Sequence, residues 1–287
     1  MRLLSFHADN SEQFGAIVDE RVVSLSERMP EYATLRNVLE AGALVRAMDI
    51  AASSSADYAV KDIRFRPPIT SAGKILCVER NYRSGEGPAD EDGDPFPSVF
   101  LRTQESLVGH REPLVKPLES DQYDYEGAIA LIIGREGRRI PRDQAYGHVA
   151  GLTLVNDGSV RDWMGRGRFD VTPGKNFERS GAMGPWLVTA DDCSPSDDLR
   201  LVTRVNEALR QEDHTARLRF PFDYLISYLS TFVRLKPGDV IVTGTPAGFG
   251  ASLAPPEFLL PGDRVSVEVE GIGVLENPVE AEAEAPG

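Results

Sequence analysis

The sequence predicts a mainly β protein of the α+β class, with a small α/β unit at the N-terminus. Its 287 residues, 41% of them hydrophobic, are enough for one large domain and a small one. In the larger part the apolar runs are short and are separated by glycine and proline, which is typical of strands. Two other stretches have apolar residues at helical spacing.

The small unit covers residues 1–66. Residues 15–19 and 22–25 are predicted to pair as a hairpin across Glu20 and Arg21, and residues 35–52 show a helical pattern. The sequence Arg-Pro-Pro-Ile at 66–69 favours an extended linker, because proline donates no backbone hydrogen bond and restricts the residue before it.

The larger unit covers residues 67–279, and its structured part is expected to begin near Lys74. Pro-Gly-Asp occurs at 237–239 and again at 261–263, each time as a turn before a valine-rich strand. The predicted strands are residues 75–78, 129–133, 149–155, 186–188, 201–205, 240–242 and 265–269.

A helix is predicted to start at Pro221, because Leu225, Tyr228, Leu229 and Phe232 fall on one face. We expect this stripe to face the core. Residues 280–287 are rich in glutamate and alanine and can bury little surface, so we expect an acidic flexible tail.

Charge and composition favour a small-molecule ligand. The net charge of −14 disfavours nucleic acid and anionic membranes as partners. Cys77 and Cys193 have no Cys or His at ligand spacing, so we expect buried free thiols. The sequence contains no apolar run long enough for a membrane span and no signal-peptide pattern, so we expect a cytoplasmic protein.

Acidic residues open the predicted strand at 124–132. In an extended chain Asp124, Glu126 and Ala128 share one face. Carboxylates in this arrangement can hold Mg²⁺, and a third acid is missing at Ala128. A solvated face of an edge strand is the alternative interpretation.

Three further polar residues follow apolar or glycine-flexed segments. Asp157 comes after a predicted strand, although Asn-Asp-Gly also reads as a simple turn. Lys175 is placed to reach a carboxylate or an enolate oxygen, although surface lysines are common. Thr245 lies in a glycine-rich segment and offers a hydroxyl to an anionic group.

The order and spacing of these clusters resemble the fumarylacetoacetate hydrolase superfamily over residues 74–279. The segments that carry the resemblance are Asn81-Tyr82, Ser106 to Gly109, Asp124 to Glu126, Asn156 to Asp162, Gly174 to Phe177, Gly184 to Leu187, Thr243 to Pro246 and Gly271 to Gly273. The resemblance implies a mixed β-sandwich roll, a homodimer, and action on 2-oxo acids or 1,3-dicarbonyl compounds.

The resemblance also assigns site residues. Glu126 and Asp157 match ligands of Mg²⁺ or Mn²⁺, and the binding of that ion is expected to be weakened because Ala128 replaces a further ligand. Lys175 and Thr245 match groups that hold the oxo-acid end of the substrate. We add Asn81, Tyr82 and Arg102 as substrate-binding residues and expect no organic cofactor.

The chain departs from the family where water is activated. The family's His and Glu of the catalytic dyad correspond here to Gly85 and Pro88. Loss of a general base costs roughly 10² to 10⁴ in rate. Glu86, beside an acidic run at 90–94, is a candidate substitute base on a predicted lid, although such a run is also typical of a solvated loop.

Three functions remain open. The first is a non-hydrolytic step on an enolisable substrate, namely tautomerisation, decarboxylation or cyclisation, possible in a biosynthetic pathway. The second is a metal-dependent C–C hydrolase or oxo-acid decarboxylase of catabolism, resembling an acylpyruvase, with Glu86 as the base. The third is a catalytically silent binding subunit.

Overall fold

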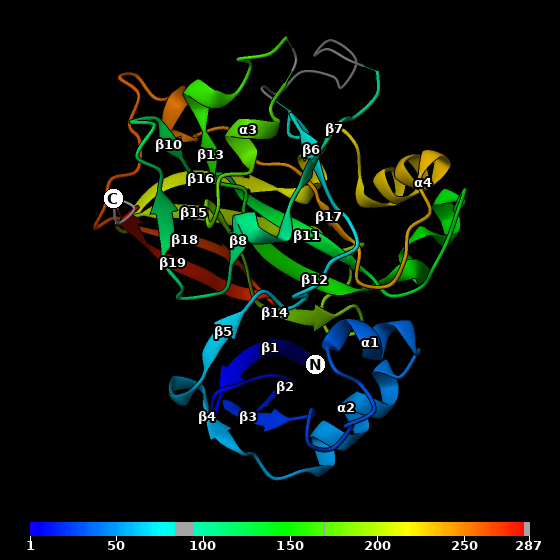
Figure 1. Cartoon of the computed structure of the whole chain (residues 1–287). Helices are drawn as coiled ribbons and strands as arrows, with labels where there is room; N and C mark the ends of the chain where they lie inside the picture. Colours follow the sequence, from blue (N-terminus) through cyan, green and yellow to red (C-terminus); the bar gives the residue numbers. More distant parts are fainter. Residues whose placement is uncertain (84–94, 169, 284–287) are drawn as a thin grey trace.

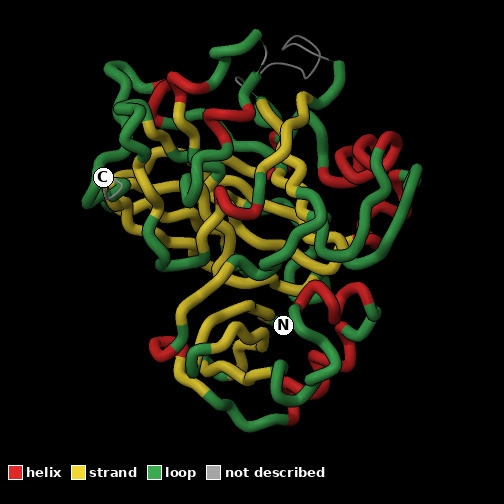
Figure 2. Tube along the Cα trace, viewed as in Figure 1, coloured by secondary structure: helices red, strands yellow, loops and turns green. Residues whose placement is uncertain are grey.

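A large sheet runs through the whole molecule and carries a second sheet on one face (Figure 1). The computed structural model describes residues 1–83, 95–168 and 170–283. Within those ranges the large sheet has 12 strands, the second has 5, and β10 pairs with β13. Strands fill the centre of the molecule and helices lie at its periphery (Figure 2). The mainly β fold predicted from sequence is confirmed.

The strands of the large sheet are β1 (Arg2–Ala8), β2 (Ser11–Val18), β3 (Arg21–Ser24), β4 (Tyr58–Ala59), β5 (Arg64–Arg66), β6 (Ile75–Glu79), β7 (Ser98–Arg102), β8 (Leu107–Val108), β11 (Gly127–Ile133), β12 (Val149–Asn156), β14 (Gly181–Thr189) and β17 (Val240–Val242). The second sheet contains β9 (Leu114–Lys116), β15 (Arg200–Val205), β16 (Ala208–His214), β18 (Arg264–Val269) and β19 (Gly273–Ala281). The small pair is β10 (Tyr123–Asp124) and β13 (Ser159–Val160), and the helices are α1 (Leu35–Glu40), α2 (Leu44–Ser53), α3 (Thr172–Lys175) and α4 (Phe222–Phe232).

Alternate side chains of β11 point to opposite faces of the large sheet and belong to two different hydrophobic clusters. Ile129, Leu131 and Ile133 pack toward the second sheet, together with valines of β18. The intervening Ala128, Ala130 and Ile132 pack on the other face, in a cluster that includes residues of α1 and α2. The seven strands predicted from apolar runs, from 75–78 to 265–269, are all present, because each apolar run is buried on at least one face.

The N-terminal unit extends the large sheet through pairing of β1 with β14. The predicted hairpin is present as β2 and β3, with Asp19 and Glu20 at positive φ in the turn. The predicted single helix at 35–52 is wrong, since α1 and α2 are separate. Gly42 has φ of 65°, and its N–H bonds to Leu39 O, so the chain turns there.

Two expectations near the C-terminus need correction. The buried face of α4 comprises Phe222, Leu225, Ile226 and Leu229, whereas Phe232, predicted to be core, is 53% exposed. Residues 280 and 281 are not part of a free tail, because β19 continues through them and pairs with β9. Residues 284–287 lie outside the described part of the chain. No helix in that part is long and apolar enough to cross a membrane. Both cysteines are buried and free, as expected.

Candidate active site

A cavity of about 260 Å³ is lined by residues of β6, β7 and α3 and of the segments that follow β10, β12 and β17. Figure 1 labels these elements. Its wall combines carboxylates, cations and apolar side chains at these strand ends. The described residues that line it are Val78, Glu79, Arg80, Phe100, Glu126, Asp157, Arg161, Met164, Val171, Lys175, Thr245 and Phe249.

Lys175 forms the centre of a buried ion cluster. Its Nζ donates to Glu126 Oε2 at 2.8 Å, to Asp157 Oδ2 at 2.9 Å and to the backbone oxygen of Asp157 at 3.2 Å. Only 1% of Lys175 is exposed. The alternative interpretation of Lys175 as a surface lysine is therefore wrong.

Two arginines hold the same carboxylates from the other side. Arg102 Nη1 donates to Asp157 Oδ1 at 2.6 Å, and its other nitrogens bond Ser106 and Ser180. Arg161 Nη1 lies 2.6 Å from Glu126 Oε1, while its Nε donates to Asp124 Oδ2 at 2.8 Å. Each oxygen of the Glu126 and Asp157 carboxylates therefore faces a cation.

These contacts keep Lys175 and Asp157 ionised. Burial alone would lower the pKa of Lys175, but attraction to Asp157 and Glu126 outweighs it and raises the pKa above the usual value. Burial would raise the pKa of Asp157, yet Lys175 and Arg102 lower it below the usual value. Lys175 is therefore an ammonium at neutral pH, and Asp157 is a carboxylate.

Glycines allow the segments of the site to approach one another. A Cβ on Gly158 would lie 1.9 Å from Ser180 O, and one on Gly174 would lie 2.3 Å from Met164 Cγ. Gly158 therefore allows the chain after β12 to pass against Ser180, and Gly174 allows α3 to pack on Met164. The side chain of Asp157 faces Arg102 and Lys175, so the simple-turn interpretation of Asp157 is wrong.

The acidic segment at 124–132 is not one strand, because β10 ends at Asp124 and β11 begins at Gly127. Asp124 is fully buried and accepts from Arg161 and from the backbone N–H groups of Gly250 and Ala251. The solvated-edge interpretation is therefore wrong. Ala128 is also fully buried, within the apolar cluster beside β6 and β17.

The donor set does not fit a resident divalent cation. Within residues 1–83, 95–168 and 170–283, no group of three or more His, Cys, Asp or Glu is placed to hold one. The four oxygens of Glu126 and Asp157 are engaged by Arg102, Arg161 and Lys175. A Mg²⁺ ion prefers oxygen ligands at about 2.0–2.1 Å, so it would have to displace one of these cations.

Thr245 reaches the cavity wall, as the sequence predicts, whereas Asn81 and Tyr82 are not among the described lining residues. Thr245 Oγ1 accepts from Gln211 Nε2 at 2.8 Å, which leaves its own O–H to donate. The Asn81 amide bonds Phe220 and Thr243 backbone groups, so it ties two segments together. Tyr82 is buried, and burial raises the pKa of its hydroxyl. Arg102 contacts Asp157 but is also absent from that wall.

Sequence reasoning missed four described wall residues that bear on chemistry: Glu79, Arg80, Arg161 and Phe249. Glu79 ends β6 and accepts a long hydrogen bond, 3.4 Å, from Ser98 Oγ. Its position directly after a predicted strand was a usable signal. In the sequence, Arg161 is marked only as part of the segment from Asn156 to Asp162 that carries the family resemblance. Glu86, the predicted substitute base, lies outside the described residues, as do Gly85 and Pro88.

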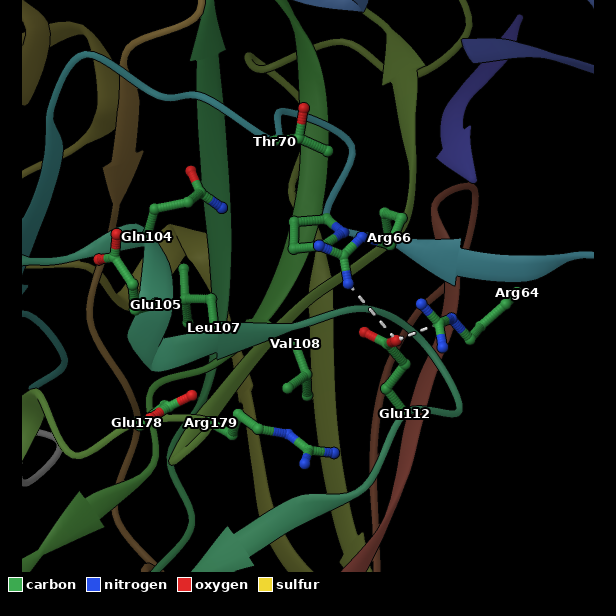
Figure 3. Close-up of a pocket in the computed structure, with 11 residues that line it drawn as sticks. Arg64, Arg66, Thr70, Gln104, Glu105, Leu107, Val108, Glu112, Glu178 and Arg179 are labelled. Atoms are coloured by element: carbon green, nitrogen blue, oxygen red, sulfur yellow. Dashed lines mark ion pairs between the residues drawn. The ribbon is translucent and has the colours of Figure 1, made fainter. Parts of the chain in front are cut away.

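A second cavity, of about 440 Å³, lies beside β5 and β8 (Figure 3). Arg64 and Arg66 both point at Glu112 there, at 3.4 and 3.6 Å. Arg64 is 63% exposed, so its pair with Glu112 is screened by solvent. No lysine is among the described residues that line this cavity.

The fold and the ion cluster define an enzyme-like cavity at the strand ends of a β-sandwich roll. Residues 74–280 match the family model for the C-terminal domain of fumarylacetoacetate hydrolase. The chain belongs to the fumarylacetoacetate hydrolase family.

Relatives in this family carry different activities. The chain is 38% identical over 219 residues to the mitochondrial oxaloacetate tautomerase FAHD2B of Bos taurus, covering 76% of this chain and 70% of that protein. A fumarylacetoacetate hydrolase of Exiguobacterium antarcticum matches with a TM-score of 0.85 and 29% identity, covering 98% of this chain and all of that one.

Two further solved structures share the fold. The 5-carboxymethyl-2-hydroxymuconate delta-isomerase of Mycobacterium smegmatis matches with a TM-score of 0.77 and 29% identity, over 98% of this chain and 100% of that one. A Sphingobium maleylpyruvate hydrolase, solved with manganese(II) and pyruvate, matches with a TM-score of 0.82, covering 99% of this chain and 100% of that one. Its 24% identity supports the fold alone.

Proposed function

We propose that this protein is an isomerase that moves a proton next to the oxo group of a 2-oxo acid or a 1,3-dicarbonyl compound. The observation that carries the proposal is that an ionised Lys175 and the Thr245 hydroxyl both line one cavity. The resemblance in sequence implies that Gly85 and Pro88 stand where family hydrolases have the water-activating dyad. Tautomerisation needs no activated water, so these replacements cost it nothing.

The reaction balances without a co-reactant. A base takes a proton from the carbon beside the oxo group, and the electrons of that C–H bond form a C=C bond. The π electrons of the C=O bond move to oxygen, which gains a proton, so keto and enol forms interconvert. Negative charge develops on that oxygen, and fixed positive groups stabilise it in a site with little water.

Lys175 has a donor that a substrate oxygen can share. Its contact with Asp157 O is its longest, at 3.2 Å, and that carbonyl also accepts from Ser159 Oγ at 3.0 Å. Replacing this contact therefore leaves Asp157 O with a partner. The two shorter bonds, to Glu126 Oε2 and Asp157 Oδ2, hold the ammonium in place meanwhile.

Glu79 is the base that the described wall supports best. The other two wall carboxylates, Glu126 and Asp157, have both oxygens engaged by cations, so neither has an open oxygen to accept a proton. Glu79 has one long hydrogen bond, from Ser98. Glu79→Gln should lower the tautomerase kcat by about 10²-fold or more, while Glu79→Asp retains part of it. If Glu79→Gln keeps full activity while Glu86→Gln is inactive, Glu86 is the base.

Two of the four named relatives carry the same reaction class in their names, one as an oxaloacetate tautomerase and one as a delta-isomerase, and the other two are hydrolases. The test is to incubate purified protein with enol-oxaloacetate and, separately, with an acylpyruvate. We expect faster loss of enol absorbance, with oxaloacetate recovered intact. Brisk release of pyruvate and a carboxylic acid from the acylpyruvate would instead establish hydrolysis, and pyruvate with CO₂ from oxaloacetate would establish decarboxylation.

A further inference from the structure

We infer that the Lys175 ammonium takes the place of a divalent cation in this site, so that the centre works without metal. The inference concerns the ion cluster itself, and its catalytic meaning rests on the proposed isomerase function. Four features of the cluster lead to it: its charge, its oxygen geometry, the packing at Ala128 and the position of Lys175 beside the cavity.

The cluster is neutral as it stands. Arg102, Arg161 and Lys175 supply three positive charges, and Asp124, Glu126 and Asp157 supply three negative ones. All six side chains are at least 86% buried. A dication added to this set would leave two uncompensated positive charges in a region with little water. Burying unpaired charge is unfavourable, which opposes binding.

Lys175 occupies the position from which one cation bridges the two acids. Its Nζ lies 2.8 Å from Glu126 Oε2 and 2.9 Å from Asp157 Oδ2. These are normal lengths for charge-assisted hydrogen bonds. A Mg²⁺ ion bound to the same two oxygens at its shorter distance would overlap the ammonium, so the two cations exclude each other.

Among the described residues, the packing around Ala128 leaves no acidic side chain there that could balance the charge of an added ion. Ala128 follows Glu126 by two residues but is fully buried in an apolar cluster with Ile75, Cys77 and Val242. Burial raises the pKa of the neighbouring Cys77 thiol well above its usual value, so the thiol is neutral there. This side of the cluster therefore supplies no third anionic ligand.

Lys175 also borders the cavity, and its Nζ lies 5.1 Å from the centre of the Phe100 ring. The same ammonium that neutralises the acids is thus available to a substrate oxygen. In this arrangement one side chain both holds the acids together and polarises the oxo group.

The test measures Mn²⁺ binding by electron paramagnetic resonance on chelator-treated, full-length protein, with no turnover required. The variants are Lys175→Met and, in case that variant is unstable, Lys175→Gln. The matched control is Lys116→Met, which removes a lysine paired with a fully exposed aspartate, Asp121. Each is also measured with Asp157→Asn, which identifies binding at this site.

We expect the wild type and Lys116→Met to show no Asp157-dependent binding at about 1 mM Mn²⁺, the weak end of the range for hard-cation sites. The Lys175 variants should gain Asp157-dependent binding, because two carboxylate oxygens lose their cation. Asp157-dependent binding by the wild type would overturn the inference. Equally, folded Lys175 variants that bind no Mn²⁺ would show that the ammonium is not what excludes it.

Activity is a separate readout. If Mn²⁺ binding behaves as expected but no oxo acid is isomerised, the proposed function fails and the metal-free cluster stands. If the wild type isomerises oxaloacetate but loses that activity after chelation and regains it with Mn²⁺, the metal-free inference fails and the function stands.

Discussion

At the scale of single residues, the site depends on cations that fix two buried acids. Arg102 is fully buried and bonds Asp157, Gly158, Ser106 and Ser180 at once. A planar guanidinium can bind several acceptors at once because its donors point in fixed directions. Arg102 is thus a positioning residue that sets where Asp157 faces Lys175.

Replacing Arg102 should therefore destabilise the fold. Arg102→Gln leaves a buried carboxylate with one cation in place of two, and we expect a loss of about 3–5 kcal/mol in the free energy of unfolding, measured with denaturant. Arg200→Gln is the control, since its pair with Glu212 is exposed and should contribute about 0–1 kcal/mol. Equal effects of the two variants would contradict the structural role of Arg102.

The pKa shifts of Asp157 and Lys175 predict how stability depends on pH. Asp157 has a lowered pKa, so its contribution is present above the unfolded value of about 3.9 and is lost as pH falls through the folded value. Lys175 has a raised pKa, so its contribution is complete below about pH 10.4 and is lost as pH rises through the folded value.

Between those limits the cluster's contribution should be constant, as checked by denaturant unfolding at a series of pH values. Asp157→Asn should flatten the acid side of the profile and also weaken the alkaline side, because attraction to Asp157 is the largest of the contributions that raise the pKa of Lys175. An unchanged acid side in Asp157→Asn would show that Asp157 does not carry the shift.

The sequence identified polar residues of the cavity wall but not the pairing of arginines with the acids among them. It selected Glu126, Asp157, Lys175 and Thr245, and all four line one cavity. It did not find that Arg102 and Arg161 occupy the remaining carboxylate oxygens, because ion pairs between residues 55 and 35 positions apart leave no local pattern. The partners of a buried acid follow from three-dimensional packing.

At the scale of elements, the site residues lie at the ends of strands, and glycines allow the connecting segments to pack closely. Predicted strands were found because alternation or continuous apolar runs mark burial. The helix at 35–52 was mispredicted because the left-handed Gly42 interrupts an otherwise continuous apolar pattern. The strand at 124–132 was mispredicted because this segment contains the end of one strand and the start of another. β10 ends at Asp124 in the two-stranded sheet, and β11 begins at Gly127 in the 12-stranded sheet.

Gly158 gives a test at this scale. A Cβ there would lie 1.9 Å from Ser180 O, so Gly158→Ala must push the segment after β12 away from the start of β14. We expect a loss of about 1–3 kcal/mol in stability from overpacking, together with loss of isomerase activity as Asp157 moves. Gly147→Ala is the control, because the nearest atom to its Cβ is the end of a flexible arginine at 3.5 Å. A fully active Gly158→Ala would contradict the close approach.

At the scale of the whole molecule, one sheet connects the N-terminal unit to the strand ends that form the site. The family fold is confirmed, and within it the chain combines a neutral buried cluster with a cavity at its edge. Relatives of this family include both a tautomerase and a hydrolase, so the fold alone does not select the reaction. The proposed isomerase function therefore rests on the charges of the site.

The most direct test of enolisation at Lys175 is exchange of deuterium from solvent into the carbon beside the oxo group of a 2-oxo acid. The exchange is followed by NMR in D₂O with a chelator present, for the wild type and Lys175→Met. We predict that the wild type accelerates exchange well above buffer and that Lys175→Met loses about 10²–10³-fold of that rate. Exchange by the wild type no faster than in buffer, or equal exchange by both proteins, would contradict the account.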